Sequence, residues 1–259
     1  MARFYLDFDG VIAHSAIECI KSAFSVWIET NDNLFLDMDL ETKSEVIAKI
    51  IDYGVANRHL VVPPEHYYCL VDSLAGELLG GYQAPSSERI KNIFVSSTQS
   101  TSAKEMAKFK YDFFSFRNNK FAIQTDTEWV QENPPTSFIG AFFELIENYP
   151  SEVLVFSRKN YKAIEKWGFG SKLPIGKIYG NEALCQFNNN KFELIKSLQR
   201  EGGYPEAFFI DDMISEFESL DWPAIGVTTL AAGWGYNNLA DNTQLILKTI
   251  KGHLDDLHH

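Results

Sequence analysis

The feature that most constrains the fold is a short apolar segment that runs from Arg3 into an acidic turn containing Asp7 and Asp9. Aromatic and aliphatic residues followed by Gly10 are typical of a buried strand that ends in a sharp turn. Two carboxylates so close together would repel each other and lose hydration unless a cation or a reaction uses them. Ligands bind at this end of the strands in open α/β sheets. The pair therefore indicates a site, the alternative being that both acids lie on a solvated turn.

The second half of the chain alternates between strand and helix patterns. Apolar runs predict strands at 153–156, 207–210 and 224–229, and helical spacing predicts helices at 138–146, 161–167, 190–199, 214–220 and 243–250. Such alternation favours a parallel sheet with helices on both faces. The expected fold class is therefore α/β, with a doubly wound parallel sheet that includes the N-terminal strand.

A helical segment separates the first strand from this alternating half. Capping-box pairs predict helix starts at Thr42 with Glu45 and at Ser102 with Glu105, since a hydroxyl and a carboxylate can satisfy free backbone donors there. Further starts are expected near 15, 63–64 and 86–87, and the prolines at 134–135 mark a boundary. We therefore predict a core domain of residues 1–14 and 134–259, interrupted by an all-helical cap domain of residues 15–133.

Composition limits the partners of the chain. The 259 residues carry a formal net charge of −12, which argues against general nucleic-acid binding, because phosphate backbones are held mainly by clustered Lys and Arg. No apolar stretch approaches the roughly 20 residues of a membrane span. Three widely spaced cysteines suggest neither a zinc site nor a disulfide framework. With no signal peptide visible, a cytoplasmic protein is expected, and the terminal His258 and His259 are left out of the site.

The segment Asp7-Phe8-Asp9-Gly10-Val11 resembles the first motif, DxDG(T/V), of the haloacid dehalogenase-like (HAD) superfamily. The resemblance implies a Rossmann-like core with an inserted cap and a phosphatase activity. It also implies that Asp7 attacks phosphorus and that Asp9 is the general acid and base. His14 stands where the common phosphatase pattern has Asp, and it is a candidate substrate contact.

Two later positions match motifs that contact phosphate in this superfamily. Ser157 directly follows a predicted strand, as in the second motif, and Arg158 beside it adds positive charge. Lys191 stands at a predicted helix start, as in the third motif, where backbone N–H groups also favour an anion. The resemblance thus implies that Ser157, Arg158, Lys191 and Gly10 bind the phosphate of a small phosphorylated substrate.

The fourth motif matches Asp211 and Asp212, which follow another apolar strand. Converging carboxylates form an oxygen-rich site suited to magnesium. By resemblance, Mg²⁺ is held by Asp7, the backbone carbonyl of Asp9 and Asp212, with Asp211 and Glu216 in supporting positions. A glycine-rich stretch at 233–236 is similar to the WGYG-like loop of phosphoglycolate-phosphatase-type members.

The expected function is a magnesium-dependent phosphohydrolase that acts through an aspartyl-phosphate intermediate. One alternative is a phosphotransferase or mutase, in which a second substrate group replaces water. The other is a non-catalytic binding module that keeps the fold. Phosphate release without an acceptor separates the enzyme alternatives, whereas departures at Arg158, Asp211 and Glu216 fit a diverged binding module.

Overall fold

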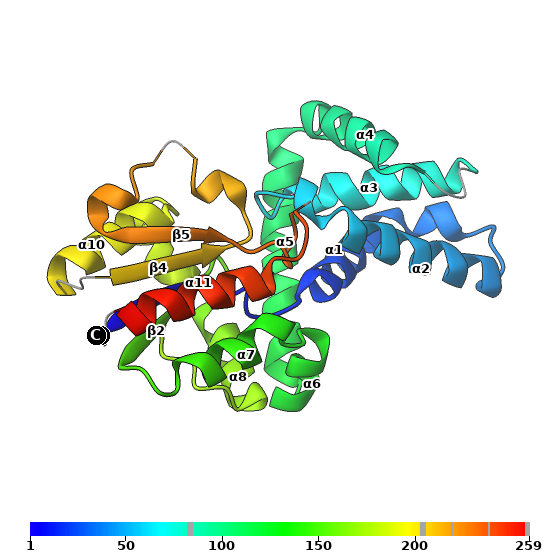
Figure 1. Ribbon diagram of the computed structural model, residues 1–259. Helices are drawn as coiled ribbons and strands as arrows, with labels where there is room; N and C mark the ends of the chain where they lie inside the picture. Colours follow the sequence, from blue (N-terminus) through cyan, green and yellow to red (C-terminus); the bar gives the residue numbers. More distant parts are fainter. Residues whose placement is uncertain (82–84, 203–205, 219, 238, 257–259) are drawn as a thin grey trace. The chain divides into compact units, whose positions relative to one another are not determined.

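The chain divides into two compact units in the computed structural model, which describes residues 1–81, 85–202, 206–218, 220–237 and 239–256 (Figure 1). One unit contains residues 1–15 and 125–259, and the other contains residues 16–124. His258 and His259 lie outside the described residues. In the described part of the chain, no helix is long and apolar enough to cross a membrane.

A five-stranded, all-parallel sheet forms the centre of the first unit. Its strands are β1 (Ala2–Asp7), β2 (Ser151–Phe156), β3 (Lys177–Tyr179), β4 (Glu206–Asp211) and β5 (Val227–Ala231). The strand order is β3-β2-β1-β4-β5, so β1 lies between β2 and β4. Asp7 is in register with Phe156, and Leu6 with Ile210. The register brings the carboxyl ends of three strands to one edge of the sheet.

Helices cover both faces of this sheet, which confirms the predicted doubly wound α/β fold. They are α6 (Asp126–Glu132), α7 (Ser137–Ile146), α8 (Tyr161–Ser171), α9 (Asn181–Leu184), α10 (Lys191–Gly202) and α11 (Thr243–Asp256), with the 3-10 turns η3 (Cys185–Phe187), η4 (Ile214–Glu216) and η5 (Pro223–Ile225). On one face, Phe192 of α10 and Phe209 of β4 pack against Trp222. On the other, Phe4 of β1 packs against Phe142 of α7.

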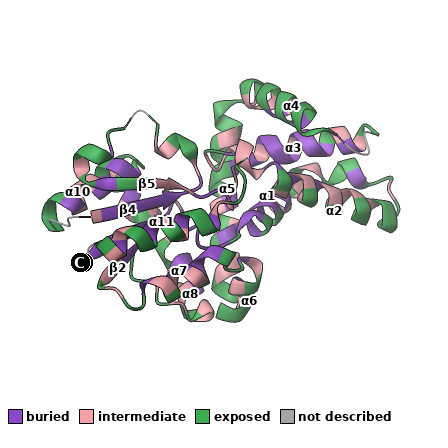
Figure 2. Cartoon of the chain, viewed as in Figure 1, coloured by how far each residue is buried: buried purple, intermediate pink, exposed green. Residues whose placement is uncertain are grey.

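In the described residues of the second unit, every regular element is a helix, as predicted for the inserted segment. Its elements are α1 (Ala16–Asn31), η1 (Asp32–Phe35), α2 (Leu40–Ala56), η2 (Arg58–Leu60), α3 (His66–Leu79), α4 (Ser87–Ser100) and α5 (Ala103–Ile123). Aromatic side chains such as Trp27, Tyr67 and Phe113 fill a core of its own. Figure 2 shows the buried sides of α1 and α3, whereas α2 and α4 expose most of their surface.

The boundary between the units differs from the predicted one. Residues 125–133, which the sequence places in the cap, belong to the sheet unit, and they include α6. Trp129 of α6 is buried, and its indole N–H donates to the carbonyl of Ala163 in α8 at 2.8 Å. This contact joins residues far apart in the sequence. The prolines at 134–135 therefore follow a helix of the core.

Several predicted local elements also differ. The helix expected at Thr42 begins at Leu40, because Asp39 is its N-cap and accepts a hydrogen bond from the Thr42 N–H at 2.9 Å. The predicted helix 214–220 is only the turn η4 in its described residues, residue 219 lying outside them. The last strand begins at Val227, after the turn η5, and the short strand β3 was not predicted. The capping box of Ser102 with Glu105 is confirmed.

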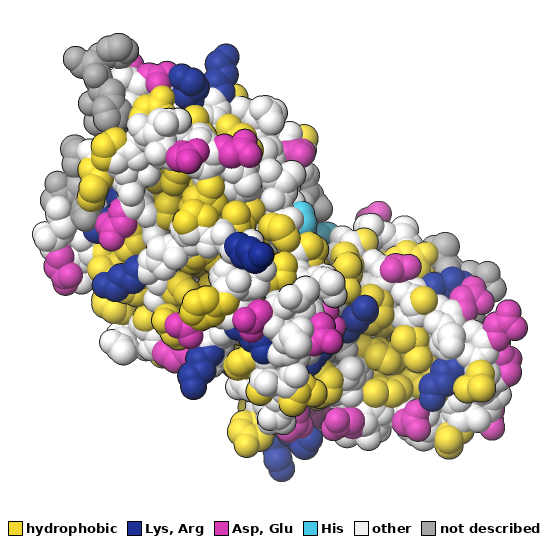
Figure 3. Space-filling view, turned by 90° about the horizontal axis from the view of Figure 1, so that it is seen from below, with side chains coloured by type: hydrophobic (Ala, Val, Ile, Leu, Met, Phe, Trp, Pro, Cys, Tyr) yellow, Lys and Arg dark blue, Asp and Glu magenta, His cyan; other side chains and the backbone are white. Residues whose placement is uncertain are grey.

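Charged side chains are mixed on the surface. On the face seen in Figure 3, Lys and Arg side chains are scattered among acidic and uncharged ones. The expectation from the net charge of −12, that the chain is not a general nucleic-acid binder, stays a prediction. Two lysines of the sheet unit, Lys159 and Lys191, are buried.

Candidate active site

Three neighbouring strands deliver polar side chains to the carboxyl edge of the sheet. Asp7 is the last residue of β1, Asp211 is the last residue of β4, and Ser157 directly follows β2. The Ser157 N–H donates to the carbonyl of Tyr179 in β3 at 3.0 Å, which continues the sheet pairing beyond the end of β2. The order of the strands therefore brings together residues that are up to about 200 positions apart.

Lys191 joins two of these carboxylates. It is the first residue of α10, and its ammonium donates to Asp7 Oδ1 at 2.7 Å and to Asp211 Oδ2 at 2.6 Å. All three side chains are buried. Burial acts to lower the pKa of Lys191, but the negative charges of Asp211 and Asp7 outweigh it, so the pKa is raised. Lys191 is therefore a fixed positive charge beside the predicted nucleophile.

Asp212 completes a group of three carboxylates. Asp7, Asp211 and Asp212 each offer one oxygen, and these atoms lie within 4.8 Å of one another. The Tyr236 N–H donates to Asp212 Oδ2 at 2.6 Å. A Cβ at Gly10 would lie 2.5 Å from that same oxygen, and Gly10 has φ +88°. Glycine is therefore required at this position both by space and by backbone conformation.

The pKa values of Asp7 and Asp211 are both raised, and burial is the largest cause in each case. Burial raises the pKa of the Asp7 carboxyl well above its usual range, and Asp211, Asp212 and Asp9 raise it further, whereas Lys191 acts in the opposite direction. Burial likewise raises the pKa of Asp211 against the effect of Lys191. Three acids and one base are thus clustered out of water. Oxygen ligands with excess negative charge are what a magnesium ion requires, so these residues fit that ion.

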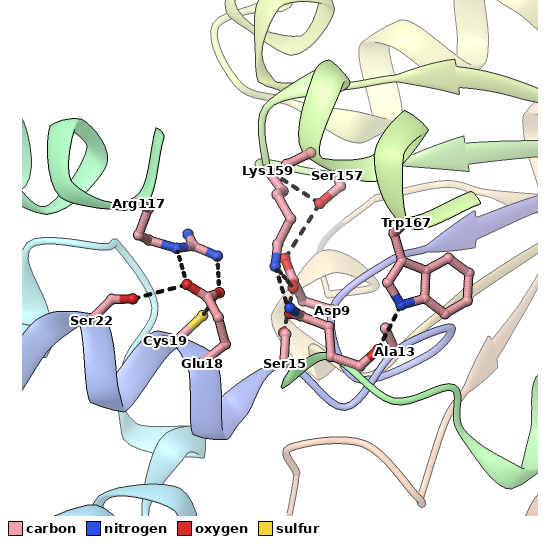
Figure 4. A network of polar contacts seen from close by, with 12 residues as sticks. Asp9, Ala13, Ser15, Glu18, Cys19, Ser22, Arg117, Ser157, Lys159 and Trp167 are labelled. Atoms are coloured by element: carbon pink, nitrogen blue, oxygen red, sulfur yellow. Dashed lines mark hydrogen bonds and ion pairs between the residues drawn. The ribbon is translucent and has the colours of Figure 1, made fainter. Parts of the chain in front are cut away.

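Asp9 is held by a second set of contacts, on the turn that follows β1 (Figure 4). Its Oδ1 accepts a short hydrogen bond from the Ser15 hydroxyl and pairs with the Lys159 ammonium at 3.0 Å. Its Oδ2 accepts from the Ser157 hydroxyl at 3.4 Å. Asp7 and Asp9 therefore occupy different surroundings: Asp7 faces the carboxylates and Lys191, and Asp9 faces hydroxyls and Lys159.

Lys159 is the site residue that sequence reasoning missed. It is buried, its backbone N–H donates to Ser157 Oγ at 3.0 Å, and its ammonium donates to Asn133 Oδ1 at 3.3 Å. The ammonium also lies 5.4 Å from the centre of the Trp129 ring. A signal for it does exist in the sequence. Side chains alternate along an extended chain, so Ser157 and Lys159 would share one side and Arg158 the other.

Arg158 and Glu216 bind each other. The guanidinium donates to Glu216 Oε1 at 2.6 Å and to the carbonyl of Asn189 at 3.3 Å. Burial acts against the charge on Arg158, but Glu216 outweighs it and raises its pKa. A phosphate contact by Arg158 stays a prediction, and Glu216 lies outside the group of three carboxylates that could hold a metal.

The remaining predicted residues lie on the turn itself. The Gly10 N–H donates to the carbonyl of Ala13 at 2.8 Å, so this donor closes the turn. The His14 N–H donates to the carbonyl of Pro134 at 2.8 Å, and the His14 residue is exposed. Phosphate binding by Gly10 and substrate binding by His14 stay predictions.

Comparisons with known proteins agree with this architecture. No family model and no curated protein matches the chain. Two similar solved structures are a haloacid dehalogenase-like hydrolase from Streptococcus pneumoniae and a candidate phosphoglycolate phosphatase from Lactobacillus delbrueckii subsp. bulgaricus. The first has 17% identity and a TM-score of 0.52, with 95% of this chain and 90% of that chain covered. The second has 11% identity and a TM-score of 0.54, with 96% and 97% covered. The chain therefore has the fold of the haloacid dehalogenase-like hydrolases.

Proposed function

We propose that the protein is a magnesium-dependent phosphohydrolase that acts on a small phosphorylated metabolite through an aspartyl-phosphate intermediate. One observation carries the proposal. A buried nucleophile candidate, an acid–base candidate, a hydroxyl and an ammonium meet at one sheet edge, as Asp7, Asp9, Ser157 and Lys191. Each of these groups has a role in phosphoryl transfer, which depends mainly on positioning and charge stabilisation.

In the first step, an Asp7 carboxylate oxygen attacks phosphorus and the bond from phosphorus to the leaving oxygen breaks. The Asp9 carboxyl group gives its proton to that oxygen, so the alcohol leaves neutral. Lys191 supplies positive charge next to Asp7, and the Ser157 hydroxyl is a donor for the phosphoryl oxygens.

In the second step, water attacks phosphorus and the acyl-phosphate bond to Asp7 breaks. Asp9, now a carboxylate, takes a proton from that water, and the products are phosphate and free Asp7. The Ser15 and Lys159 contacts of Asp9 support this role, because they hold its carboxylate in one position.

The residues that would hold magnesium are Asp7, Asp212 and the backbone carbonyl of Asp9, with Asp211 next to them. When bound, the ion would neutralise charge on the phosphoryl group. Asp212→Asn should weaken Mg²⁺ binding measured by calorimetry more than Glu216→Gln does, because Glu216 is engaged by Arg158. The opposite ranking would contradict the assignment.

A screen over phosphate esters tests the function. The panel contains sugar phosphates, nucleotides and phosphorylated carboxylic acids, the last because one structural neighbour carries the name of a candidate phosphoglycolate phosphatase. Phosphate release is measured with and without Mg²⁺, with no acceptor present, so that a hydrolase is distinguished from a phosphotransferase or mutase. After acid quenching, mass spectrometry should find the phosphoryl group on Asp7. Absence of Mg²⁺-dependent hydrolysis across the panel would favour the binding module.

A further inference from the structure

The loop after β5 contacts the metal-binding candidate Asp212 through its backbone. The Tyr236 N–H donates to Asp212 Oδ2 at 2.6 Å. At the preceding residue, Gly235, a Cβ would lie 2.2 Å from the Asp212 Cβ, so only glycine allows the loop this close. The loop backbone therefore fixes the position of the Asp212 carboxylate.

The side chain of the same tyrosine extends to the acid–base candidate. The Tyr236 hydroxyl oxygen accepts from the Ser15 N–H at 2.5 Å and lies 3.2 Å from Ser15 Oγ. The Ser15 hydroxyl in turn donates to Asp9 Oδ1. Ser15 is fully buried, so water does not compete freely for these bonds. A continuous chain of contacts thus runs from the Tyr236 phenol through Ser15 to Asp9.

A neighbouring residue makes the loop a firm support. The Trp234 indole N–H donates to the carbonyl of Val11 at 3.3 Å, and its ring stacks on Phe138 with ring centres 4.4 Å apart. Thr136 donates to the same carbonyl at 2.7 Å. The turn that carries Asp9 is therefore attached both to the loop and to the segment that begins α7.

We propose that Tyr236 is a positioning residue that orients Asp9 through Ser15, while its own backbone holds Asp212. This inference rests on the proposed function, since Asp9 needs an exact orientation only if it transfers protons. An acid–base group must lie within hydrogen-bond reach of the leaving oxygen, and a displacement of about 1 Å can cost roughly 10²-fold in rate. One tyrosine would thus keep the proton-transfer group and the metal ligand in fixed relative positions.

The test is Tyr236→Phe, which removes the hydroxyl and keeps the backbone N–H to Asp212. With an alkyl phosphate, whose leaving oxygen needs a proton, kcat should fall by about 10- to 100-fold while KM changes by less than about twofold. With p-nitrophenyl phosphate, whose leaving group needs little protonation, the loss should be several times smaller. The Mg²⁺ dissociation constant measured by calorimetry should be unchanged.

Matched variants control the test. Tyr149→Phe also deletes a phenol hydrogen bond, to Asp255 at 2.5 Å, but leaves every site contact in place and should leave kcat unchanged. Ser15→Ala breaks the same chain one step nearer to Asp9 and should give the same preference for the good leaving group. If Tyr236→Phe folds poorly, Ser15→Ala tests the inference in its place. Combined, the two changes should cost less than the product of their separate effects, because they act through one chain.

Other outcomes overturn the inference. An equal loss with both substrates, or a weakened Mg²⁺ affinity, would assign the hydroxyl a structural or metal-related role. Wild-type kinetics in both Tyr236→Phe and Ser15→Ala would remove the role altogether. A failure of the proposed function is distinct, because it shows in the wild-type protein as no phosphatase activity, and the inference then fails with it.

Discussion

Both units of the molecule bury charged side chains, but they balance those charges differently. In the helical unit, Arg117 of α5 donates to both oxygens of Glu18 in α1, at 2.9 and 2.5 Å, and Ser22 adds a third hydrogen bond at 2.9 Å. Glu18 is fully buried, and one guanidinium matches one carboxylate (Figure 4). The opposite charges of Arg117 and Glu18 are thus paired with each other, and the pair joins α5 to α1 within one core.

At the carboxyl edge of the sheet, the buried charges are arranged differently. Oxygens of Asp7, Asp211 and Asp212 lie within 4.8 Å of one another, Lys191 donates to Asp7 and Asp211, and the pKa of Asp7 is raised by burial and by its acidic neighbours. Such a cluster opposes folding unless a bound ion or substrate compensates it. The difference between the units is one of arrangement: in the helical unit one guanidinium is paired with one carboxylate, whereas the sheet unit gathers three carboxylates, as the proposed metal site requires.

The largest expected effect comes from replacing Asp7, the proposed nucleophile. Asp7→Asn should lower turnover by roughly 10⁴-fold or more, because no carboxylate is left to attack phosphorus. The folded protein without Mg²⁺ should melt at the same temperature or higher. A carboxyl whose pKa is raised on folding destabilises the native state once the pH exceeds its unfolded pKa, and the amide removes that penalty. A lower melting temperature would mean that the charge of Asp7 is balanced after all.

The matched pair should respond in the opposite way. Glu18→Gln leaves the Arg117 guanidinium in the core without its carboxylate, which should cost about 3–5 kcal/mol of folding free energy. Urea unfolding followed by circular dichroism measures the loss. Glu45→Gln is the control, because it breaks an exposed pair with Lys49 and should cost about 0.5 kcal/mol or less. If Glu18→Gln and Glu45→Gln lose the same folding free energy, the buried pair contributes no more to stability than the exposed pair, and the prediction is wrong.

Within the candidate site, replacing Lys159 should lower kcat more than replacing the adjacent Arg158. Lys159→Met removes the buried partner of Asp9 and should lower kcat by about 10²-fold, the lower end of what general acid–base catalysis contributes. Arg158→Met should cost less than about tenfold, since Arg158 pairs with Glu216. Steady-state kinetics with the best substrate from the screen measures both. A greater loss from Arg158→Met would restore the phosphate contact expected from the sequence.

The smallest effect is expected for a solvent-exposed hydrogen bond that caps a helix. Ser102 caps α5, with its hydroxyl accepting from the Glu105 N–H at 3.2 Å. Ser102→Ala should cost about 1 kcal/mol of unfolding free energy. Ser96→Ala, at an exposed position inside α4, removes a serine hydroxyl that caps nothing and should be neutral or slightly stabilising. Similar losses in both variants would show that the cap contributes nothing.

Local signals were sufficient for much of the fold and for the main site positions. The strand ending at Asp7, the strand before Ser157 and the helix starting at Lys191 could each be predicted, because apolar runs and capping patterns depend on near neighbours. The parallel topology then brings their ends together. The proximity of Asp7, Lys191 and Asp211 was therefore predictable before any distance was known.

The features that sequence reasoning missed depend on distant contacts. Helix α6 belongs to the sheet unit because Trp129 packs on α8, and nothing near Trp129 in the sequence indicates this. The alternation of side chains separates Lys159 from Arg158, but the contacts of Lys159 with Asp9 and Asn133, which are far from it in the sequence, could not be predicted. Glu216 was expected in a supporting position around the metal; its ion pair with Arg158 was not predicted, and the supporting role stays a prediction.

In the sequence, the helical unit is inserted between β1 and β2, and this insertion affects the order in which the chain can fold on the ribosome. Residues 16–124 are continuous and have their own core, so this unit can fold as soon as it emerges. Strand β1 is made earlier, yet its partners are Ser151–Phe156 and Glu206–Asp211. At roughly 5–20 residues per second, β4 follows the helical unit by about 4–17 s. The carboxylates of the candidate site are therefore assembled last, and a nascent chain stalled before β4 would have a folded helical unit and an incomplete sheet.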